Sequence, residues 1–367
     1  MAQPCLVISS EFPPGPGGIG QHAWSLVQAL RQYSNVHVLA HQDYASSDEV
    51  HAFNEAMDGA VTVTPFIRRW GKFQLVYKVV TAFRLFRRLR PERVIVTGRF
   101  PVWVGGLLKI VYPKSTVVGF AHGSEVTAQG GLPARITYWA LRRLDAVWAV
   151  STFTQQALAP ANVRHIGVLP NGIDSQLLAI ARQPQPAFPW QGDPRLLTVG
   201  NLTPRKGQHR VIQSLPAICE QFPGVQYHIV GLPTTKPHLQ QLAETLGVAN
   251  HITFHNRLPK REDLYRAFAS ADIFIMLSEN QPNGDVEGFG IAILEANAFG
   301  IPAIGAKGCG IEDAIGPESG ILVDGNNHTE ITKAIKTILN NYQAYSTGAR
   351  NWAEQHNWDT LITKIVG

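Results

Sequence analysis

Two glutamates, Glu287 and Glu295, flank a glycine-containing turn in the run EGFGIAILEA. The pattern predicts a helix that begins near Phe289 or Gly290 and carries Glu295 among apolar residues, with the amides of Gly288, Phe289 and Gly290 in the loop at its start. Backbone amides at a helix start favour an anion, and carboxylates accept hydrogen bonds from hydroxyl groups. We therefore expect the loop amides to bind a phosphate, Glu287 a sugar, and an inward-facing Glu295 a ribose. The alternative is a capping glutamate followed by an unrelated one.

Two adjacent cations, Arg205 and Lys206, follow the apolar run Leu196–Gly200 and precede Gly207. The run predicts a strand, and parallel sheets bind ligands beyond the carboxyl ends of their strands. Arginine can bind two phosphate oxygens at once and lysine adds a point charge, so this turn suits a diphosphate. Asn201 begins the same turn and is a further candidate. A solvated basic turn that binds nothing is an equal alternative.

A glycine-rich turn, Pro13–Gly20, separates a predicted strand at Cys5–Ser9 from a predicted helix. Glycine lets backbone amides approach a ligand closely, so we expect Gly17 and Gly18 to contact a phosphate or a sugar. A turn that only joins the strand to the helix is the alternative.

A histidine, His122, follows the predicted strand Val117–Ala121 and precedes Gly123. A lone histidine is more often structural, but this one lies at the carboxyl end of a strand, where active-site groups collect. We take His122 as a candidate contact to a sugar or its phosphate.

The elements that must position these turns alternate along the chain, with short apolar runs between longer segments of helical periodicity. Strands that alternate with helices imply parallel βαβ units, and two such series imply two doubly wound α/β domains. The expected strands are Cys5–Ser9, Val36–Ala40, Val61–Thr64, Val94–Thr97, Val117–Ala121, Ala146–Ser151, His165–Leu169, Leu196–Gly200, Gln226–Gly231, Ile252–Phe254, Ile273–Leu277, Ala303–Gly305 and Ile321–Val323.

A proline-rich stretch at 181–194 lies between the two series and predicts an interdomain linker. We therefore expect an N-terminal domain at residues 1–180 and a C-terminal domain at residues 195–350. The last residues, 351–367, predict a helix that crosses back to the first domain. Two facing carboxyl edges would form one deep cleft.

Together these segments resemble the retaining glycosyltransferases of family 4, which have the GT-B fold of two facing Rossmann-like domains. The run at 287–302 resembles the E-x7-E segment of that family, and Arg205 with Lys206 resembles its diphosphate-binding pair. His122 is similar to its cleft histidine, and the run VLPNGID at 168–174 to the segment that ends its first domain. The motifs cover nearly the whole chain.

The resemblance implies a nucleotide-diphosphate sugar donor on the C-terminal domain and a glycan or lipid-linked acceptor on the N-terminal domain. Arg205 and Lys206 would stabilise the departing diphosphate, which is the role of a metal ion in other transferases, so no metal or other cofactor is expected. Glu287 would bind the donor sugar, Glu295 the ribose and His122 the sugar or its phosphate. Transfer would retain configuration by front-face attack. The DVEG context favours GDP-mannose over a UDP-sugar.

Two positions depart from the family pattern. Many relatives carry an arginine where this chain has Asn201, and an aspartate where it has Glu125. The phosphate contacts of this turn and the role of Glu125 are therefore open.

The segment from Arg68 to Arg99 holds ten Lys and Arg residues and one acid, Glu92. Apolar residues recur at helical spacing between Phe73 and Leu89, which predicts a basic amphipathic helix suited to an anionic membrane surface. No nucleic-acid-binding motif accompanies the cations, so no nucleic-acid partner is expected. An ordinary solvated helix face is the alternative. The cations expected at the membrane are Lys78, Arg84, Arg87 and Arg88.

Composition favours a folded cytoplasmic protein. Hydrophobic residues make up 45% of the chain and charged residues 16%, which argues against wholesale disorder. The first residues lack the features of a secretory signal, and the three separated cysteines are typical of reduced thiols. We expect a cytoplasmic protein, with a peripheral position on the inner face of the plasma membrane as a hypothesis.

Other functions stay open at this point. A dinucleotide-dependent oxidoreductase would use Gly15, Gly17 and Gly20, but Asp43 is only loosely placed as its ribose-binding acid. A non-transferring GT-B enzyme, such as a sugar-nucleotide epimerase or a phosphorylase, would share the fold, as would a sugar-nucleotide-binding protein.

Overall fold

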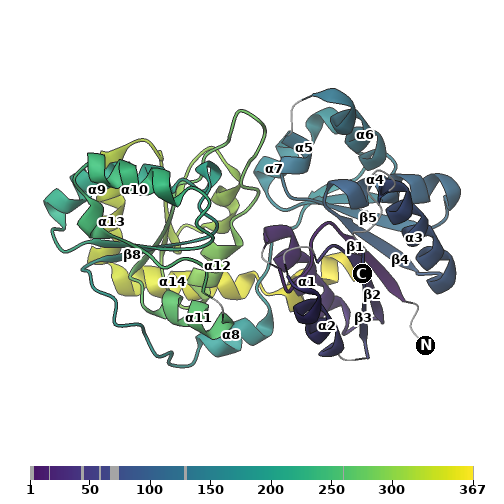
Figure 1. The fold of residues 1–367 in the computed structure, drawn as a ribbon, viewed down its shortest axis with the longest axis horizontal. Coiled ribbons are helices and arrows are strands. Elements are labelled where there is room, and N and C mark those ends of the chain that lie inside the picture. Colours follow the sequence, from purple (N-terminus) through teal and green to yellow (C-terminus); the bar gives the residue numbers. More distant parts are fainter. Residues whose placement is uncertain are drawn as a thin grey trace. The chain divides into compact units, whose positions relative to one another are not determined.

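The computed structural model describes residues 4–15, 17–42, 45–57, 59–66, 74–127, 130–258 and 260–366. The chain divides into two compact units, which Figure 1 shows as ribbons. The first comprises Met1–Asp174 with Trp358–Gly367, and the second comprises Ser175–Asn357.

The first unit contains a parallel sheet of seven described strands in the order β3-β2-β1-β4-β5-β6-β7. The order reverses between β1 and β4, so the loops after these two strands leave a crevice at the carboxyl edge. The strands are β1 Cys5–Ser9, β2 Val36–Ala40, β3 Val61–Pro65, β4 Arg93–Thr97, β5 Thr116–Ala121, β6 Ala146–Ala149 and β7 Ile166–Val168.

Helices cover both faces of this sheet. One apolar core joins α1, α15 and α16 to the strands, and a second joins α3, α4 and α6 to them. Because both faces are covered, consecutive strand residues such as Leu6, Val7 and Ile8 are all fully buried. The helices are α1 Gly18–Leu30, α2 Ser47–Glu55, α3 Gln74–Leu89, α4 Arg99–Val111, α5 Ser124–Thr127, α6 Gly131–Leu141, α7 Thr152–Ala157, α15 Trp358–Leu361 and α16 Thr363–Val366.

The second unit contains a parallel sheet of six strands among the described residues, in the order β10-β9-β8-β11-β12-β13. Here the order reverses between β8 and β11. The strands are β8 Arg195–Val199, β9 Gln226–Val230, β10 Ile252–Phe254, β11 Ile273–Met276, β12 Ala303–Ala306 and β13 Gly320–Val323.

The helices of the second unit lie on both sides of its sheet (Figure 1): α9, α10 and α13 pack together on one side, and α12, α14 and α8 on the other. They are α8 Ser175–Ala181, α9 Gln208–Gln221, α10 Lys236–Thr245, α11 Arg261–Ala269, α12 Ile291–Ala298, α13 His328–Asn340 and α14 Tyr342–Gln355.

The predicted α/β class and every predicted strand are confirmed, with small shifts at the strand ends. The largest shift is at β6, which ends at Ala149 instead of Ser151. Ser151 instead caps α7, because its hydroxyl accepts a hydrogen bond from the Thr154 N–H at 3.1 Å. A side-chain cap thus ended the strand earlier than its apolar pattern predicted.

The proline-rich segment at 181–194, which we expected to be an interdomain linker, is grouped with the second unit, which begins at Ser175. Its Trp190 stacks on the rings of His228 and His255, with centroid distances of 4.3 Å and 4.5 Å. Prolines and missing periodicity excluded regular structure here, but they carried no information about this stacking.

The limits of the units also differ from the expected domains. The first unit ends at Asp174 rather than at 180, because α8 belongs to the second unit. The Arg350 guanidinium of α14 donates to the carbonyl of Ala181, at the end of α8, at 3.4 Å. Because α14 runs on to Gln355, the segment that belongs to the first unit begins at Trp358 and not at 351.

Trp358 packs in the core of the first unit, where only 1% of its surface is exposed. We expect Trp358→Ala to lower the free energy of unfolding of this unit by about 3–5 kcal/mol, the usual cost of truncating a buried tryptophan. Hydrogen exchange should accelerate in α1 peptides and stay unchanged in the second unit. Leu132→Ala, at a side chain 68% exposed, is the control and should cost less than about 0.5 kcal/mol. Equal protection in both variants would contradict this role for Trp358.

Candidate functional site

The topology of the second unit places two chemically important loops side by side. β8 pairs in parallel with β11, so the loops after these strands leave the same carboxyl edge at the point where strand order reverses. The first loop carries Arg205 and Lys206, and the second carries Glu287, 82 residues further along the chain than Arg205.

Both cations contact the same carboxylate oxygen. Nζ of Lys206 lies 2.8 Å from Oε2 of Glu287, and Nη1 of Arg205 donates to that oxygen as well. Nε of Arg205 also lies 3.0 Å from Oδ1 of Asp285. The structure thus assembles two cations and two carboxylates into one ion cluster, which we call the switch-point cluster.

The cluster fixes the ionisation state of Glu287, whose side chain is buried. Burial alone raises the pKa of this carboxyl, but the Lys206 and Arg205 cations and the Gly290 N–H lower it by more. The net pKa therefore lies below the ordinary value, and Glu287 is an anion at neutral pH. It can accept hydrogen bonds from ligand hydroxyls, but it cannot act as a proton donor.

Gly207 allows the two loops to approach at this distance. Its φ is 73°, and a Cβ atom at this position would lie 1.8 Å from the carbonyl oxygen of Leu277. The Glu279 N–H donates to the carbonyl of Arg205 at 2.9 Å, and the Arg210 guanidinium donates to Oε1 of Glu279 at 2.8 Å. Backbone and side chains together therefore hold the basic turn against the acidic loop.

The glycine loop before α12 differs in part from the prediction. Gly290, with a φ of 84°, is the residue before the helix, which begins at Ile291. Phe289 is only 1% exposed and Gly288 is buried, so Phe289 packs in the core and its side chain is not a ligand contact. Ligand contacts of this loop therefore depend on its backbone amides.

The two other predicted donor residues of this unit have accessible surface. Glu295 is half-buried on α12, whereas we expected it to face inward, enclosed in the core. Asn201 is exposed, and its carbonyl accepts a hydrogen bond from Nε2 of Gln208 at 3.2 Å.

The predicted glycine turn lies at the switch point of the first unit, after β1. Gly18 is exposed, and a Cβ atom there would meet nothing within 4 Å, so its backbone faces open space. Oε2 of Glu11 accepts a hydrogen bond from the Gly20 N–H at 3.4 Å and would lie 2.0 Å from a Cβ atom at Gly17. A carboxylate thus shares this turn with the exposed amides.

His122 is anchored on three sides. Its Nε2 lies 2.6 Å from Oγ1 of Thr97, its backbone N–H donates to Oε1 of Glu125, and its ring centroid lies 4.7 Å from that of His22. Burial lowers the pKa of His122 to about 3, so the ring is neutral at physiological pH. Within the described part of the chain, Nδ1 has no partner and is the nitrogen left for a ligand.

Sequence reasoning missed three residues around these sites, although the rule that placed His122 could have found two of them. Thr97 ends β4 and Glu11 follows β1, so both lie at the carboxyl edge of the first sheet. His22 carried no comparable signal, because its contacts depend on tertiary packing.

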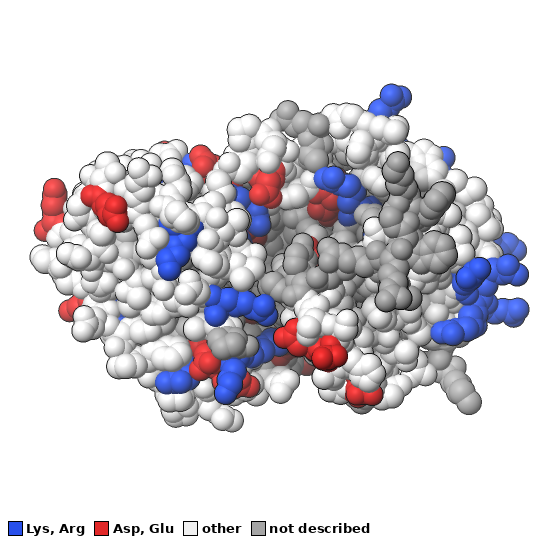
Figure 2. Space-filling view, in the orientation of Figure 1, with Lys and Arg blue, Asp and Glu red and all other residues white. Residues whose placement is uncertain are grey.

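The predicted membrane-facing helix is present as α3, but its faces differ from the prediction. Lys78 is half-buried, with Nζ 5.2 Å from the ring centroid of Phe100 and 5.9 Å from that of Phe66. It therefore does not join the exposed cations, which are Arg84, Arg87 and Arg88. Figure 2 shows Lys and Arg side chains gathered where Figure 1 places α3.

The apolar residues of α3 are also partly exposed. Val76 is 58% exposed and Val80 39%, while the helix buries Ala82, Leu85 and Phe86. Arg68, Phe73 and the Asp43 of the dinucleotide alternative lie outside the described residues. Among the described helices, none is long and apolar enough to cross a membrane.

Comparison with known proteins gives matches along both halves of the chain. The model of Glycosyltransferase Family 4 matches residues 16–177, and that of Glycosyl transferases group 1 matches residues 182–355. The chain is 31% identical to the GDP-mannose-dependent alpha-(1-6)-phosphatidylinositol monomannoside mannosyltransferase of Mycolicibacterium smegmatis, over 98% of this chain and 97% of that protein. The corresponding enzyme for the monoacylated acceptor from Corynebacterium glutamicum is 27% identical, over 91% and 88%.

Solved structures agree on the fold. The crystal structure of Anabaena HepE in complex with UDP and glucose has a TM-score of 0.75 at 19% identity, covering 99% of this chain and 98% of that one. Sucrose-phosphate synthase from Thermosynechococcus elongatus has a TM-score of 0.77 at 19% identity, covering 99% and 97%. With two parallel α/β units and matches to both halves, the chain belongs to glycosyltransferase family 4 and is a glycosyltransferase of the GT-B fold.

Proposed function

We propose that this glycosyltransferase moves a mannosyl group from GDP-mannose to a hydroxyl of a glycan or lipid-linked acceptor, with retained configuration and without a metal ion. The switch-point cluster is the observation that carries the proposal. The choice of donor is supported by the relatives named above as GDP-mannose-dependent, which align over nearly their whole length.

The cations of the cluster suit the pyrophosphate of the donor. Negative charge grows on the diphosphate as its bond to the sugar breaks, and fixed cations stabilise that charge without reorganisation. Arg205 and Lys206 are pre-positioned by Gly207 and by their contacts with Glu287. When the diphosphate takes these cations, the Glu287 carboxylate is released to accept hydrogen bonds from sugar hydroxyls.

A front-face reaction fits the ionisation states of the site. The bond between the sugar and the diphosphate breaks, the acceptor oxygen bonds to the same face of the sugar, and a diphosphate oxygen takes the acceptor proton. No protein acid is then required, which agrees with an ionised Glu287. We propose that Nδ1 of His122 contacts a sugar hydroxyl.

The acceptor is proposed to be a membrane glycolipid. The printed names of the mannosyltransferase relatives specify phosphatidylinositol mannosides as their acceptors. In this chain α3 exposes Leu75, Val76 and Val80 together with its cations, a combination that suits an anionic membrane surface. We propose peripheral membrane contact through α3, at the inner face of the plasma membrane.

The cluster makes a direct prediction about turnover. Lys206→Ala and Glu287→Ala should each lower the rate of GDP release from GDP-mannose by about 100-fold or more. Each variant lacks a charged side chain that is proposed to contact the reacting diphosphate or the sugar. Lys307→Ala is the matched control: it removes an exposed cation, paired with Glu330 at 2.8 Å, from the same unit. Its rate should stay within about twofold of wild type, since exposed ion pairs contribute little. Wild-type rates in the first two variants, with unchanged thermal unfolding, would refute the assignment.

Metal independence is tested by chelation. With Arg205 and Lys206 stabilising the leaving diphosphate, we expect an excess of EDTA to leave the initial rate with GDP-mannose unchanged. A loss of activity that added Mg²⁺ or Mn²⁺ restores would show that a metal ion supplies this stabilisation instead.

Membrane contact is tested by charge reversal on α3. Arg84→Glu, Arg87→Glu and Arg88→Glu together should abolish flotation with anionic liposomes, because repulsion replaces attraction at three exposed positions. The control reverses three exposed cations elsewhere, Arg164, Lys333 and Lys336, with the same change in net charge. Flotation of the α3 variant at the level of this control would end the proposal.

A further inference from the structure

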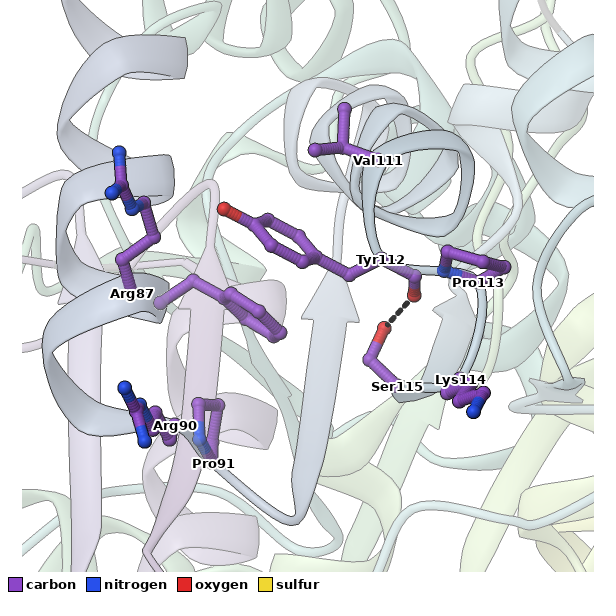
Figure 3. Close-up of a pocket in the computed structure, with 9 residues that line it drawn as sticks. Arg87, Arg90, Pro91, Val111, Tyr112, Pro113, Lys114 and Ser115 are labelled. Atoms are coloured by element: carbon purple, nitrogen blue, oxygen red, sulfur yellow. Dashed lines mark hydrogen bonds between the residues drawn. The ribbon is translucent and has the colours of Figure 1, made fainter.

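A pocket of about 660 Å³ lies in the first unit, away from the carboxyl edge that carries His122. It opens at the opposite edge of the sheet, between the end of α3 and the turn that joins α4 to β5. Figure 3 shows Arg87 and Arg90 on one wall and Val111 to Ser115 on the other. Its lining consists of Phe86, Arg87, Arg90, Pro91, Val111, Tyr112, Pro113, Lys114 and Ser115.

The lining contains three cations, Arg87, Arg90 and Lys114, and no acid. For none of these three side chains do the described residues supply a hydrogen bond or an ion pair. In the turn between α4 and β5, the polar groups are satisfied by a different lysine. Nζ of Lys109 lies 2.8 Å from the Pro113 carbonyl, from the Ser115 carbonyl and from Oδ1 of Asp145. Lys114 takes no part in these contacts.

The backbone at Arg90 gives a second, independent indication. Its φ is 46°, in the left-handed region that costs a residue with a Cβ about 1–2 kcal/mol. The other described non-glycine residues with positive φ are Asn162 and Asn256, and asparagine tolerates this conformation. Position 90 follows α3, where glycine is the favoured residue. An arginine held there against its preference suggests that its side chain serves a purpose beyond ending the helix.

The pocket also has an apolar component. The rings of Phe86 and Tyr112 stack in its lining, with centroids 4.5 Å apart and planes 30° apart. Ile110 and Val111, at the end of α4, are each 55% exposed beside the cations. Exposed aliphatic side chains next to unpaired cations match an amphiphile with an anionic head better than a fully soluble anion.

We propose that this pocket binds the phosphate of an anionic phospholipid head group, with Arg87, Arg90 and Lys114 around the phosphate and Ile110 and Val111 against the apolar part of the lipid. The proposal rests on the membrane contact proposed above for this enzyme. It adds a defined site for one lipid at the C-terminal end of α3. A diffuse charged surface, in contrast, would show no preference among anionic lipids.

The experiment compares vesicles of equal surface charge. One set contains phosphatidylcholine with phosphatidylglycerol, and the other contains phosphatidylcholine with a fatty acid, which is anionic but lacks phosphate. The pocket variant is the full chain with Arg90→Gly and Lys114→Gln. The matched control variant carries Arg84→Gln and Arg88→Gln, which remove the same charge from α3 outside the pocket. Arg90→Gly places glycine, the favoured residue, at a φ of 46°, so the temperature of thermal unfolding should not fall.

Wild type should prefer phosphatidylglycerol vesicles. The pocket variant should bind them about 25-fold more weakly, at about fivefold per cation, and should lose the preference. The control variant should weaken binding to both vesicles by the same factor and keep the preference. A preference that survives in the pocket variant, or that wild type lacks, would overturn the proposal.

A calorimetric titration with inorganic phosphate distinguishes the source of the phosphate. Binding of free phosphate that the pocket variant loses, without any phosphatidylglycerol preference, would identify a soluble-anion site and overturn the lipid assignment. No nucleotide sugar is present in either assay. Failure of mannosyl transfer would therefore contradict the proposed reaction without contradicting the lipid site. Loss of the phosphatidylglycerol preference would contradict the lipid site without contradicting the proposed reaction.

Discussion

The sharing of one carboxylate, Glu287, by two cations is the interaction on which the carboxyl edge of the second sheet depends. A buried carboxylate without cations would take up a proton, and two adjacent cations without a carboxylate would repel each other. The parallel pairing of β8 with β11 brings Arg205 and Glu287 together across 82 residues of sequence. Because the switch-point cluster balances its own charges, an anionic ligand that binds Arg205 and Lys206 must exchange with the carboxylates already present. In the proposed reaction, this exchange would couple diphosphate binding to the release of Glu287 for the sugar.

The same electrostatic reasoning explains why the glycine turn of the first unit does not indicate a dinucleotide enzyme, an alternative that the family assignment removes. A dinucleotide fold would place its pyrophosphate on this turn. Here the Glu11 carboxylate lies against Gly17 and Gly20. A second anion at that place would meet like charge, whereas a ligand with hydroxyl groups could use the carboxylate and the exposed amides together.

The sequence was sufficient for the strands and their alternation with helices, because strands covered on both faces leave long apolar runs that local patterning reveals. It was also sufficient to find the two loops of the second unit, since both follow such runs. It was insufficient where tertiary contacts decide. The stacking of Trp190 on His228, the position of Lys78 over two aromatic rings and the burial of Phe289 all depend on partners distant in sequence.

The histidine pair of the first unit shows how burial tunes a site without any charge. His22 is 1% exposed, and neither ring nitrogen has a hydrogen-bond partner within the described residues. Burial, and next the neighbouring His122, lower the pKa of His22, so this ring also stays neutral. The two neutral rings pack edge to face, and Thr97 fixes the orientation of His122, which carries no positive charge at neutral pH. A fixed neutral imidazole can form a hydrogen bond with a hydroxyl group, but it has no charge with which to attract a phosphate.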